Sequence, residues 1–323
     1  MLSTEENRVA TSIPFRILSL DGGGAKGFYT LGILSEIEAM TGKPICETFD
    51  LIFGTSTGAI IAALLARGET VSTVHSLYEK HVPEIMKASG ACCRTRALHA
   101  LAHKVFKDET CDVFKTGIGI VASNWDDERP MIFKASVNQA HGSKASFAPF
   151  FGICLADAVI ASCSAYPFFK THTVKKSNGD IITLADGGFC ANNPTLYAIA
   201  DATVALKHSH DNLRVVSLGV GTYPRLSFLK RALRGVKNCA LIRHLPSSYF
   251  LQKILGTNTS SMDTLRHVLF KDVPTIRISD TFAEPEMATD LLEHDQRKLN
   301  RLVQKGRLSF AQHETELINF LKA

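Results

Sequence analysis

Residues 49–66 read FDLIFGTSTGAIIAALLA, an apolar strand followed at once by an apolar helix. Gly54-Thr55-Ser56-Thr57-Gly58 joins the two and has the pattern G-x-S-x-G. A sharp strand-to-helix turn needs small residues on both sides, and it presents the serine hydroxyl at the edge of a sheet. The first turn of the helix also favours negative charge there. Ser56 is therefore a candidate nucleophile, the alternative being a serine that only caps the helix.

A second glycine-rich turn lies closer to the N-terminus. Residues 15–20, FRILSL, predict a buried strand, and Asp21-Gly22-Gly23-Gly24-Ala25-Lys26-Gly27 leads from it into a helix over about 26–40. Consecutive glycines let backbone N–H groups point to one place without interference from side chains. We expect Gly22, Gly23 and Gly24 to form an oxyanion hole for an acyl-transfer intermediate, where one well-placed donor contributes ~3 kcal/mol.

The same turn permits another interpretation, because Gly22, Gly24 and Gly27 satisfy the dinucleotide-binding pattern G-x-G-x-x-G. Asp21 opposes it, since a carboxylate beside the glycines would repel a pyrophosphate. The acidic residue expected about 20 positions later, at the end of the next strand, is also missing, and Asp50 begins that strand instead. A non-catalytic nucleotide-binding protein remains the alternative from a different functional class.

A third motif, Asp186-Gly187-Gly188, ends the apolar strand 181–185 and is followed by Asn192-Asn193-Pro194. A carboxylate at the carboxyl end of a strand, next to two glycines, is able to approach a serine on a neighbouring strand and accept its proton. Asp-Gly is also a common turn dipeptide, which is the simpler explanation when the motif stands alone. Beside the other two motifs, Asp186 is the candidate general base.

The alternation of strands and helices predicts an α/β fold with a mainly parallel central sheet and helices on both faces. Ligands bind such sheets at the carboxyl ends of the strands, where the three motifs lie. We expect a core over residues 15–222 and a mainly helical C-terminal extension over 223–323, packed on the same domain. The further predicted strands are 49–53, 131–137, 181–185 and 215–219, and the further helices 57–67, 155–164 and 194–206.

The composition is that of an ordinary folded protein, with 45% hydrophobic and 21% charged residues among 323. The net charge of +5 is compatible with an anionic partner, but no nucleic-acid-binding module is present. None of the eight cysteines forms a C-x-x-C pair, so no metal site is expected. We find no secretory signal and expect a cytoplasmic protein. The apolar run 59–66 is too short to cross a bilayer, so membrane contact would be peripheral.

Taken together, D-G-G-G-x-x-G at 21–27, G-x-S-x-G at 54–58 and D-G-G at 186–188 resemble the patatin-like phospholipase family. Residues 161–169, ASCSAYPFF, and 218–222, LGVGT, also resemble family segments, and the likeness covers 15 to about 222. It implies a three-layer α/β/α fold and a Ser56–Asp186 dyad that cleaves phospholipid acyl esters without metal or cofactor. Lys26 stands where the family usually carries a basic residue. The motif glycines are Gly22, Gly23, Gly24, Gly27, Gly54, Gly58, Gly187 and Gly188.

Within that family, a bacterial branch consists of anti-phage effectors that cyclic nucleotides switch on. The chain is similar to that branch in its compact length and in having no secretion signal. The resemblance implies a phospholipid substrate, a cyclic-nucleotide activator and action at the inner face of the membrane. Whether the chain forms a homo-oligomer is left open.

Two further questions stay open at this stage. A Ser–His–Asp triad would need one of six histidines beyond Asp186, none of which has a distinctive setting. The basic window 225–237 interleaves leucines at helical spacing and fits either an anionic membrane surface or an ordinary surface helix. That window, or the basic residues of 94–107, is also a candidate for gripping an activating phosphate. The six histidines are His208, His210, His244, His267, His294 and His313.

Overall fold

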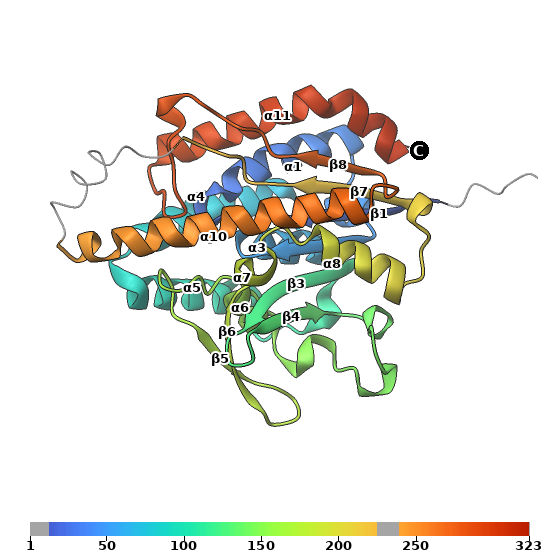
Figure 1. Ribbon diagram of the computed structural model, residues 1–323, viewed down its shortest axis with the longest axis horizontal. Helices are drawn as coiled ribbons and strands as arrows, with labels where there is room; N and C mark the ends of the chain where they lie inside the picture. The colour runs from blue at the N-terminus through green and yellow to red at the C-terminus, as the bar shows by residue number, and fades with distance from the viewer. Residues whose placement is uncertain (1–12, 225–238, 323) are drawn as a thin grey trace, which may run out of the picture.

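The computed structural model describes residues 13–224 and 239–322, and an eight-stranded sheet lies at its centre (Figure 1). The strand order is β5-β6-β3-β2-β1-β7-β8, with β4 pairing with β3. The run β3-β2-β1-β7-β8 is parallel, which confirms the predicted mainly parallel sheet. The strands are β1 Phe15–Leu20, β2 Leu51–Thr55, β3 Gly117–Asn124, β4 Arg129–Lys134, β5 His172–Lys175, β6 Ile181–Asp186, β7 Leu213–Leu218 and β8 Thr275–Ile278.

Helices cover both faces of this sheet. Successive side chains of a strand point to opposite faces, and in β1 Leu18 and Leu20 join one apolar cluster while Ile17 joins the other. The larger cluster packs α1, α3, α4, α5, α6 and α11 on one face, and the smaller one packs α8 on the other. The helices are α1 Gly27–Thr41, α2 Ile45–Thr48, α3 Thr57–Arg67, α4 Val71–Lys87, α5 Gly90–Phe106, α6 Leu155–Ser162, α7 Gly188–Ala191, α8 Thr195–Ala200, α10 Cys239–Leu269 and α11 Gln296–Lys322.

The strand β3 brings the serine and carboxylate motifs together. One edge of β3 is occupied by β4, and the other edge is shared, first by β2 and then by β6. Thr55 at the end of β2 lies opposite Val121, and Asp186 at the end of β6 lies opposite the next residue, Ala122. Because β6 runs antiparallel to β3, the carboxyl ends of β2 and β6 meet head to head.

The predicted elements are confirmed for the core, with boundaries shifted by a few residues. The strand predicted at 49–53 lies at Leu51–Thr55, and the helix predicted at 26–40 is α1. The sequence analysis missed β3, β5 and β8. The region beyond 222 contains the two long helices α10 and α11 together with β8, which pairs with β7 in the central sheet. The boundary at 222 stays a prediction, and the basic window 225–237 lies outside the described residues.

The long helices of this C-terminal region lie against the core. Figure 1 shows α10 running across the face of the sheet that carries α8, while α11 lies along α1. Helices α1 and α11 cross at two glycines: a Cβ on Gly32 would lie 2.2 Å from the Val303 carbonyl oxygen, and one on Gly306 would lie 2.1 Å from that of Tyr29. None of the described helices is by itself long and apolar enough to span a bilayer.

Candidate active site

Ser56 occupies a strained turn between β2 and α3. Its φ of 54° and ψ of −122° are unfavourable for a residue with a side chain, and the surroundings must hold it there. Its N–H donates to the Ser162 hydroxyl at 2.9 Å. Positions 54 and 58 must be glycine because the backbone packs closely there: a Cβ on Gly54 or Gly58 would lie 2.3 Å from a backbone oxygen. This is the geometry that the G-x-S-x-G spacing predicts.

Asp186 is buried at the end of β6 and has one oxygen committed. Its Oδ1 accepts the Gly188 N–H at 2.7 Å, whereas Oδ2 is buried with no partner in hydrogen-bond geometry among the described residues. Burial raises the pKa of Asp186 to about 6, and the nearby Ser56 hydroxyl and the Gly188 N–H oppose that rise. The carboxyl group is therefore poised to exchange a proton near neutral pH, and Oδ2 is the oxygen left for the Ser56 proton.

The glycine loop offers fewer free donors than the sequence suggests. The Gly22 N–H donates to the Asn192 carbonyl at 2.9 Å, so Gly22 does not fit its predicted role as an oxyanion donor. The N–H groups of Gly23 and Gly24 have no acceptor among the described residues, and both glycines line the cavity that contains Ser56. The oxyanion-hole prediction is thus narrowed to Gly23 and Gly24.

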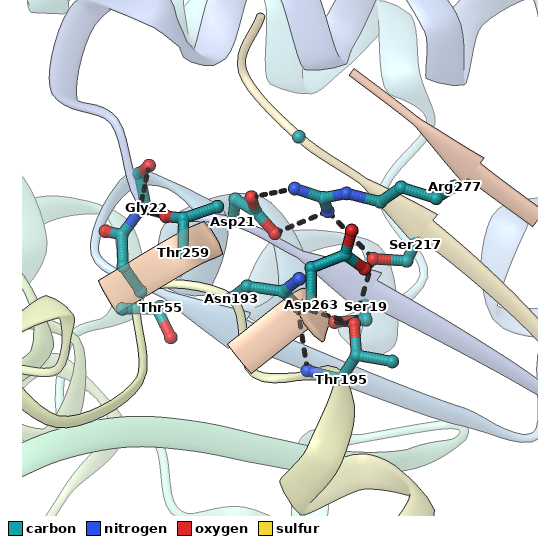
Figure 2. A network of polar contacts seen from close by, with 12 residues as sticks. Ser19, Asp21, Gly22, Thr55, Asn193, Thr195, Ser217, Thr259, Asp263 and Arg277 are labelled. Carbon is teal, nitrogen blue, oxygen red and sulfur yellow. Dashed lines mark hydrogen bonds and ion pairs between the residues drawn. The ribbon is translucent and has the colours of Figure 1, made fainter. Parts of the chain in front are cut away.

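Asp21, just before these glycines, forms a buried ion pair that fixes the start of the loop. Arg277 of β8 donates to both of its carboxylate oxygens, at 2.8 and 2.5 Å, and to the Ser217 hydroxyl at 2.8 Å (Figure 2). Lys26 carries a side chain whose pKa burial lowers, while Asp290 and Asp21 oppose that fall. Arg277 could not be predicted from the sequence, because it is a single charged residue within the apolar strand TIRI.

Asn192 connects the glycine loop to α10. Its side-chain amide donates to the Gly22 carbonyl at 3.2 Å and to the Thr259 hydroxyl at 2.7 Å, and its backbone N–H donates to Asn258 Oδ1 at 2.8 Å. The Asn192 side chain also packs against Gly188 of the third motif. The sequence analysis noted Asn192 without assigning it a role, and nothing in its local pattern points to partners 66 and 67 residues away.

A narrow apolar cavity of about 90 Å³ opens at Ser56 and Asp186. Gly23 and Gly24 line its polar end, and apolar side chains of α3, α4, α5 and α6 form the rest of its walls. Helix α5 covers this cavity with Leu98, Leu101, Ala102, Val105 and Phe106. Such a lining suits a hydrocarbon chain whose carboxyl end lies at Ser56.

A second cavity, of about 910 Å³, lies on the other side of the glycine loop and is much more polar. Gly22 faces this cavity and not the apolar one, whereas Gly23, Asn192, Leu255 and Leu291 line both. Its walls come from the loop 219–224, from α10 and from Arg277 of β8. The two cavities are therefore separated by the glycine loop and a few side chains.

None of the histidines whose side chains the structure describes lines the cavity that contains Ser56 and Asp186. The ring of His208 stacks on Phe15, and the rings of His294 and His313 contact backbone carbonyls. His210 pairs with Asp272 at 2.7 Å, and His267 is exposed. His244 lies in the part of α10 whose side chains are not described. In residues 13–224 and 239–322, no group of three His, Cys, Asp or Glu side chains could hold a metal ion.

Residues 18–199 match the family described as "Patatin-like phospholipase". An Escherichia coli protein named "cUMP-AMP-activated phospholipase" is 57% identical over 308 residues, which cover 95% of this chain and 93% of that protein. A Pseudomonas aeruginosa "cGAMP-activated phospholipase" is 28% identical, over 66% of this chain and 64% of its own length. The crystal structure of VipD from Legionella pneumophila is similar in fold, with a TM-score of 0.50, 14% identity, and coverage of 93% of this chain and 66% of that one.

Proposed function

The chain belongs to the patatin-like phospholipase family, and we propose that it hydrolyses phospholipid acyl esters with Ser56 as the nucleophile and Asp186 as the general base. Family membership makes it a lipid acyl hydrolase. The catalytic assignment rests on one observation: the ends of β2 and β6 meet on one edge of β3, so that Ser56 and Asp186 line one apolar-walled cavity. None of the described histidine side chains belongs to that lining, which favours a dyad over a Ser–His–Asp triad.

In the proposed reaction the Ser56 hydroxyl oxygen attacks the ester carbonyl carbon while its proton passes to Asp186. The negative charge that develops on the carbonyl oxygen is stabilised by the N–H groups of Gly23 and Gly24. The tetrahedral intermediate then breaks its bond to the alcohol, which takes the proton back from Asp186 as it leaves. Water then attacks the acyl-enzyme while its proton passes to Asp186, and the second tetrahedral intermediate releases the fatty acid as the Ser56 oxygen takes that proton back.

We further propose that a cyclic dinucleotide activates the enzyme, since the relatives that carry such names include one 57% identical over nearly the whole chain. The size of the acyl cavity supports a resting state that needs activation. At about 90 Å³ it is well below the roughly 300–1,000 Å³ of small-molecule sites, so a fatty acyl chain has to widen it. The proposed setting is the inner face of the bacterial membrane, reached peripherally, in defence against phage.

Lipid mass spectrometry tests this function. Mixed phospholipid vesicles are incubated with the wild type or with Ser56→Ala, each with and without cyclic UMP–AMP. We expect free fatty acid and lysophospholipid to appear with the wild type only, and faster with the nucleotide. Equal product from Ser56→Ala would rule out the proposed nucleophile, and equal rates with and without nucleotide would rule out activation.

A further inference from the structure

The polar cavity behind the glycine loop is the most conspicuous part of the molecule that the hydrolytic reaction does not use. Its volume of about 910 Å³ lies near the upper end of the roughly 300–1,000 Å³ that small-molecule sites enclose. It borders the acyl cavity without containing Ser56 or Asp186. We propose that this cavity binds the activating cyclic dinucleotide, an inference that rests on the proposed activation of the same enzyme.

The charges around the cavity suit the two phosphates of such a ligand. Lys26, Lys253 and Arg277 line it, against two acidic residues, Asp21 and Asp263. The Asp21 charge is offset by one of these cations, Arg277, and the Asp263 charge by Arg266 at 3.2 Å, which does not line the cavity. The Lys26 ammonium group forms no hydrogen bond or ion pair with the described residues, although burial disfavours its charge. A phosphate beside Lys26 would supply the missing counter-charge.

The helix wall is rich in groups that could hydrogen-bond to ribose and base edges. Residues 256–264 of α10 read GTNTSSMDT, a composition with low helix propensity. Thr257, Ser260, Ser261 and Thr264 are exposed and line the cavity. Residues that form a helix poorly lie here without packing against the core, which is expected if their hydroxyl groups bind a ligand.

Polar atoms without partners point to the same place. Tyr223 Oη, Thr289 Oγ1 and Asn192 Oδ1 are buried, have no hydrogen-bond partner among the described residues, and belong to residues that line the cavity. A buried polar group left unpaired costs about 1–3 kcal/mol, so native proteins keep few of them. Three such atoms on residues beside one cavity would gain partners from a ligand whose binding moves the wall enough to reach them.

Two hydrogen-bonded connections run from residues that line the cavity to the glycine loop, and Figure 2 shows the one from Arg277 to Asp21. In the first connection, the Arg277 guanidinium donates to the Asp21 carboxylate. In the second, the Asn192 side-chain amide donates both to the Thr259 hydroxyl of α10 and to the Gly22 carbonyl. Leu255 of α10 lines both cavities and packs against Gly188 of the third motif. A ligand that shifts α10 or competes for Arg277 would therefore alter both the oxyanion loop and the entrance of the acyl cavity.

Calorimetric titration of the full chain in a Ser56→Ala background tests this site without any turnover, with cyclic UMP–AMP and cyclic GMP–AMP as probes. Gly256→Trp is the blocking variant: Gly256 lines the cavity and a Cβ there meets nothing within 4 Å, so the indole has room to enter the cavity without displacing the surrounding chain. Gly142→Trp is the control, because Gly142 has equally open surroundings and lies outside the cavity lining. Tyr223→Phe removes only the unpaired hydroxyl.

We expect the parent and Gly142→Trp to bind one of the nucleotides with the same Kd, and Gly256→Trp to bind it at least about tenfold more weakly. Tyr223→Phe should weaken binding by roughly tenfold without lowering the Tm, because the hydroxyl has no partner to lose in the free protein. Binding of neither nucleotide by the parent, or unchanged binding by Gly256→Trp, overturns the proposal.

A phospholipid headgroup carries the same phosphate chemistry, and a second titration separates it from the nucleotide. Glycerophosphoglycerol is titrated into the parent and into Gly256→Trp. Suppose that the parent binds the headgroup and Gly256→Trp does not, while both bind the nucleotide equally well. That result would assign the cavity to substrate and overturn the proposal. If the protein binds the nucleotide but the wild type hydrolyses no lipid, the nucleotide site would be supported and the proposed reaction would be wrong.

Discussion

At the scale of single residues, the proposed reaction depends most on Asp186 and the pKa of its carboxyl group. Its carboxyl group is buried, one oxygen is held by the Gly188 N–H, and the other is available to Ser56. Burial raises its pKa to about 6, which gives a base strong enough to accept a hydroxyl proton yet largely ionised at neutral pH. A water-exposed aspartate would be a weaker base.

The rate should therefore fall as this carboxyl group becomes protonated. Only the carboxylate accepts the Ser56 proton, so kcat/KM should be level above about pH 7 and fall about tenfold per pH unit well below the pKa of about 6. The measurement is the initial rate on a soluble p-nitrophenyl ester between pH 4.5 and 8.5. A profile that stays level down to pH 4.5 would contradict this role for Asp186.

The same pKa makes a prediction about stability. Because the pKa of Asp186 is raised from 3.8 to about 6 on folding, the folded state binds more protons than the unfolded state between these values, and Asp186 destabilises the fold increasingly as pH rises through them. Asp186→Asn removes this term and should stabilise the protein at pH 7 by up to about 3 kcal/mol relative to its effect at pH 4. Urea unfolding at both pH values measures the difference, and a difference of opposite sign would count against the raised pKa.

The sequence was informative about residues that belong to short motifs. Ser56 and Asp186 each lie at the end of an apolar strand and beside glycines, and in the structure both line one cavity. The role predicted for Gly22 failed because its N–H is taken by the Asn192 carbonyl, a pairing 170 residues apart that no local pattern reveals. Arg277 and Thr259 were missed for the same reason.

At the scale of elements, the turn into α3 is held by the close approach of two backbones. A Cβ at Gly58 would lie 2.3 Å from the Leu20 carbonyl oxygen and 2.7 Å from that of Asp21, so the helix start is pressed against the glycine loop. Gly58→Ala should therefore cost about 1–3 kcal/mol and displace the donors of the loop. Gly256→Ala, in the open surroundings of α10, should instead stabilise by up to about 1 kcal/mol.

Urea unfolding and ester hydrolysis of these two alanine variants give the comparison. The expected outcome is a destabilised, slow Gly58→Ala and an active Gly256→Ala. Equal stability and equal rates would mean that the contact between α3 and the glycine loop does not hold the site.

Strand β8 is joined to the loop by the Asp21–Arg277 pair. Arg277→Met leaves the Asp21 carboxylate buried without its partner, and breaking such a pair typically costs about 3–5 kcal/mol. Asp21→Asn in addition removes the stranded charge, so the double variant should regain part of that loss. Chemical denaturation of the two single variants and the double variant measures the coupling, and strict additivity would exclude it.

Element prediction succeeded where apolar periodicity was strong and failed where it was not. The helix α3 was predicted with its observed bounds because an uninterrupted apolar run follows Gly58. The strand β3 begins with GIGI, and because glycine is uncommon in strands this segment was not predicted, although it pairs on both edges. The four residues of β8 include a charged arginine, so neither strand length nor alternation was available as a signal.

At the scale of the whole molecule, the glycine loop and a few side chains separate the apolar cavity at Ser56 from the polar cavity. The mainly parallel α/β architecture followed from the order of elements along the chain. The head-to-head meeting of β2 and β6 did not, because it depends on β6 running antiparallel to β3. The arrangement brings a hydroxyl, a carboxylate and two unpaired N–H groups to the mouth of one cavity.

The most direct test of this arrangement is intact-mass measurement of a fluorophosphonate adduct over time. The wild type is compared with Ser56→Ala, Asp186→Asn and the six single alanine variants of His208, His210, His244, His267, His294 and His313, all with circular dichroism as a check of folding. The dyad predicts one adduct per chain in the wild type and in every histidine variant, none in Ser56→Ala, and greatly slowed labelling in Asp186→Asn. A folded histidine variant that labels as slowly as Asp186→Asn would contradict it.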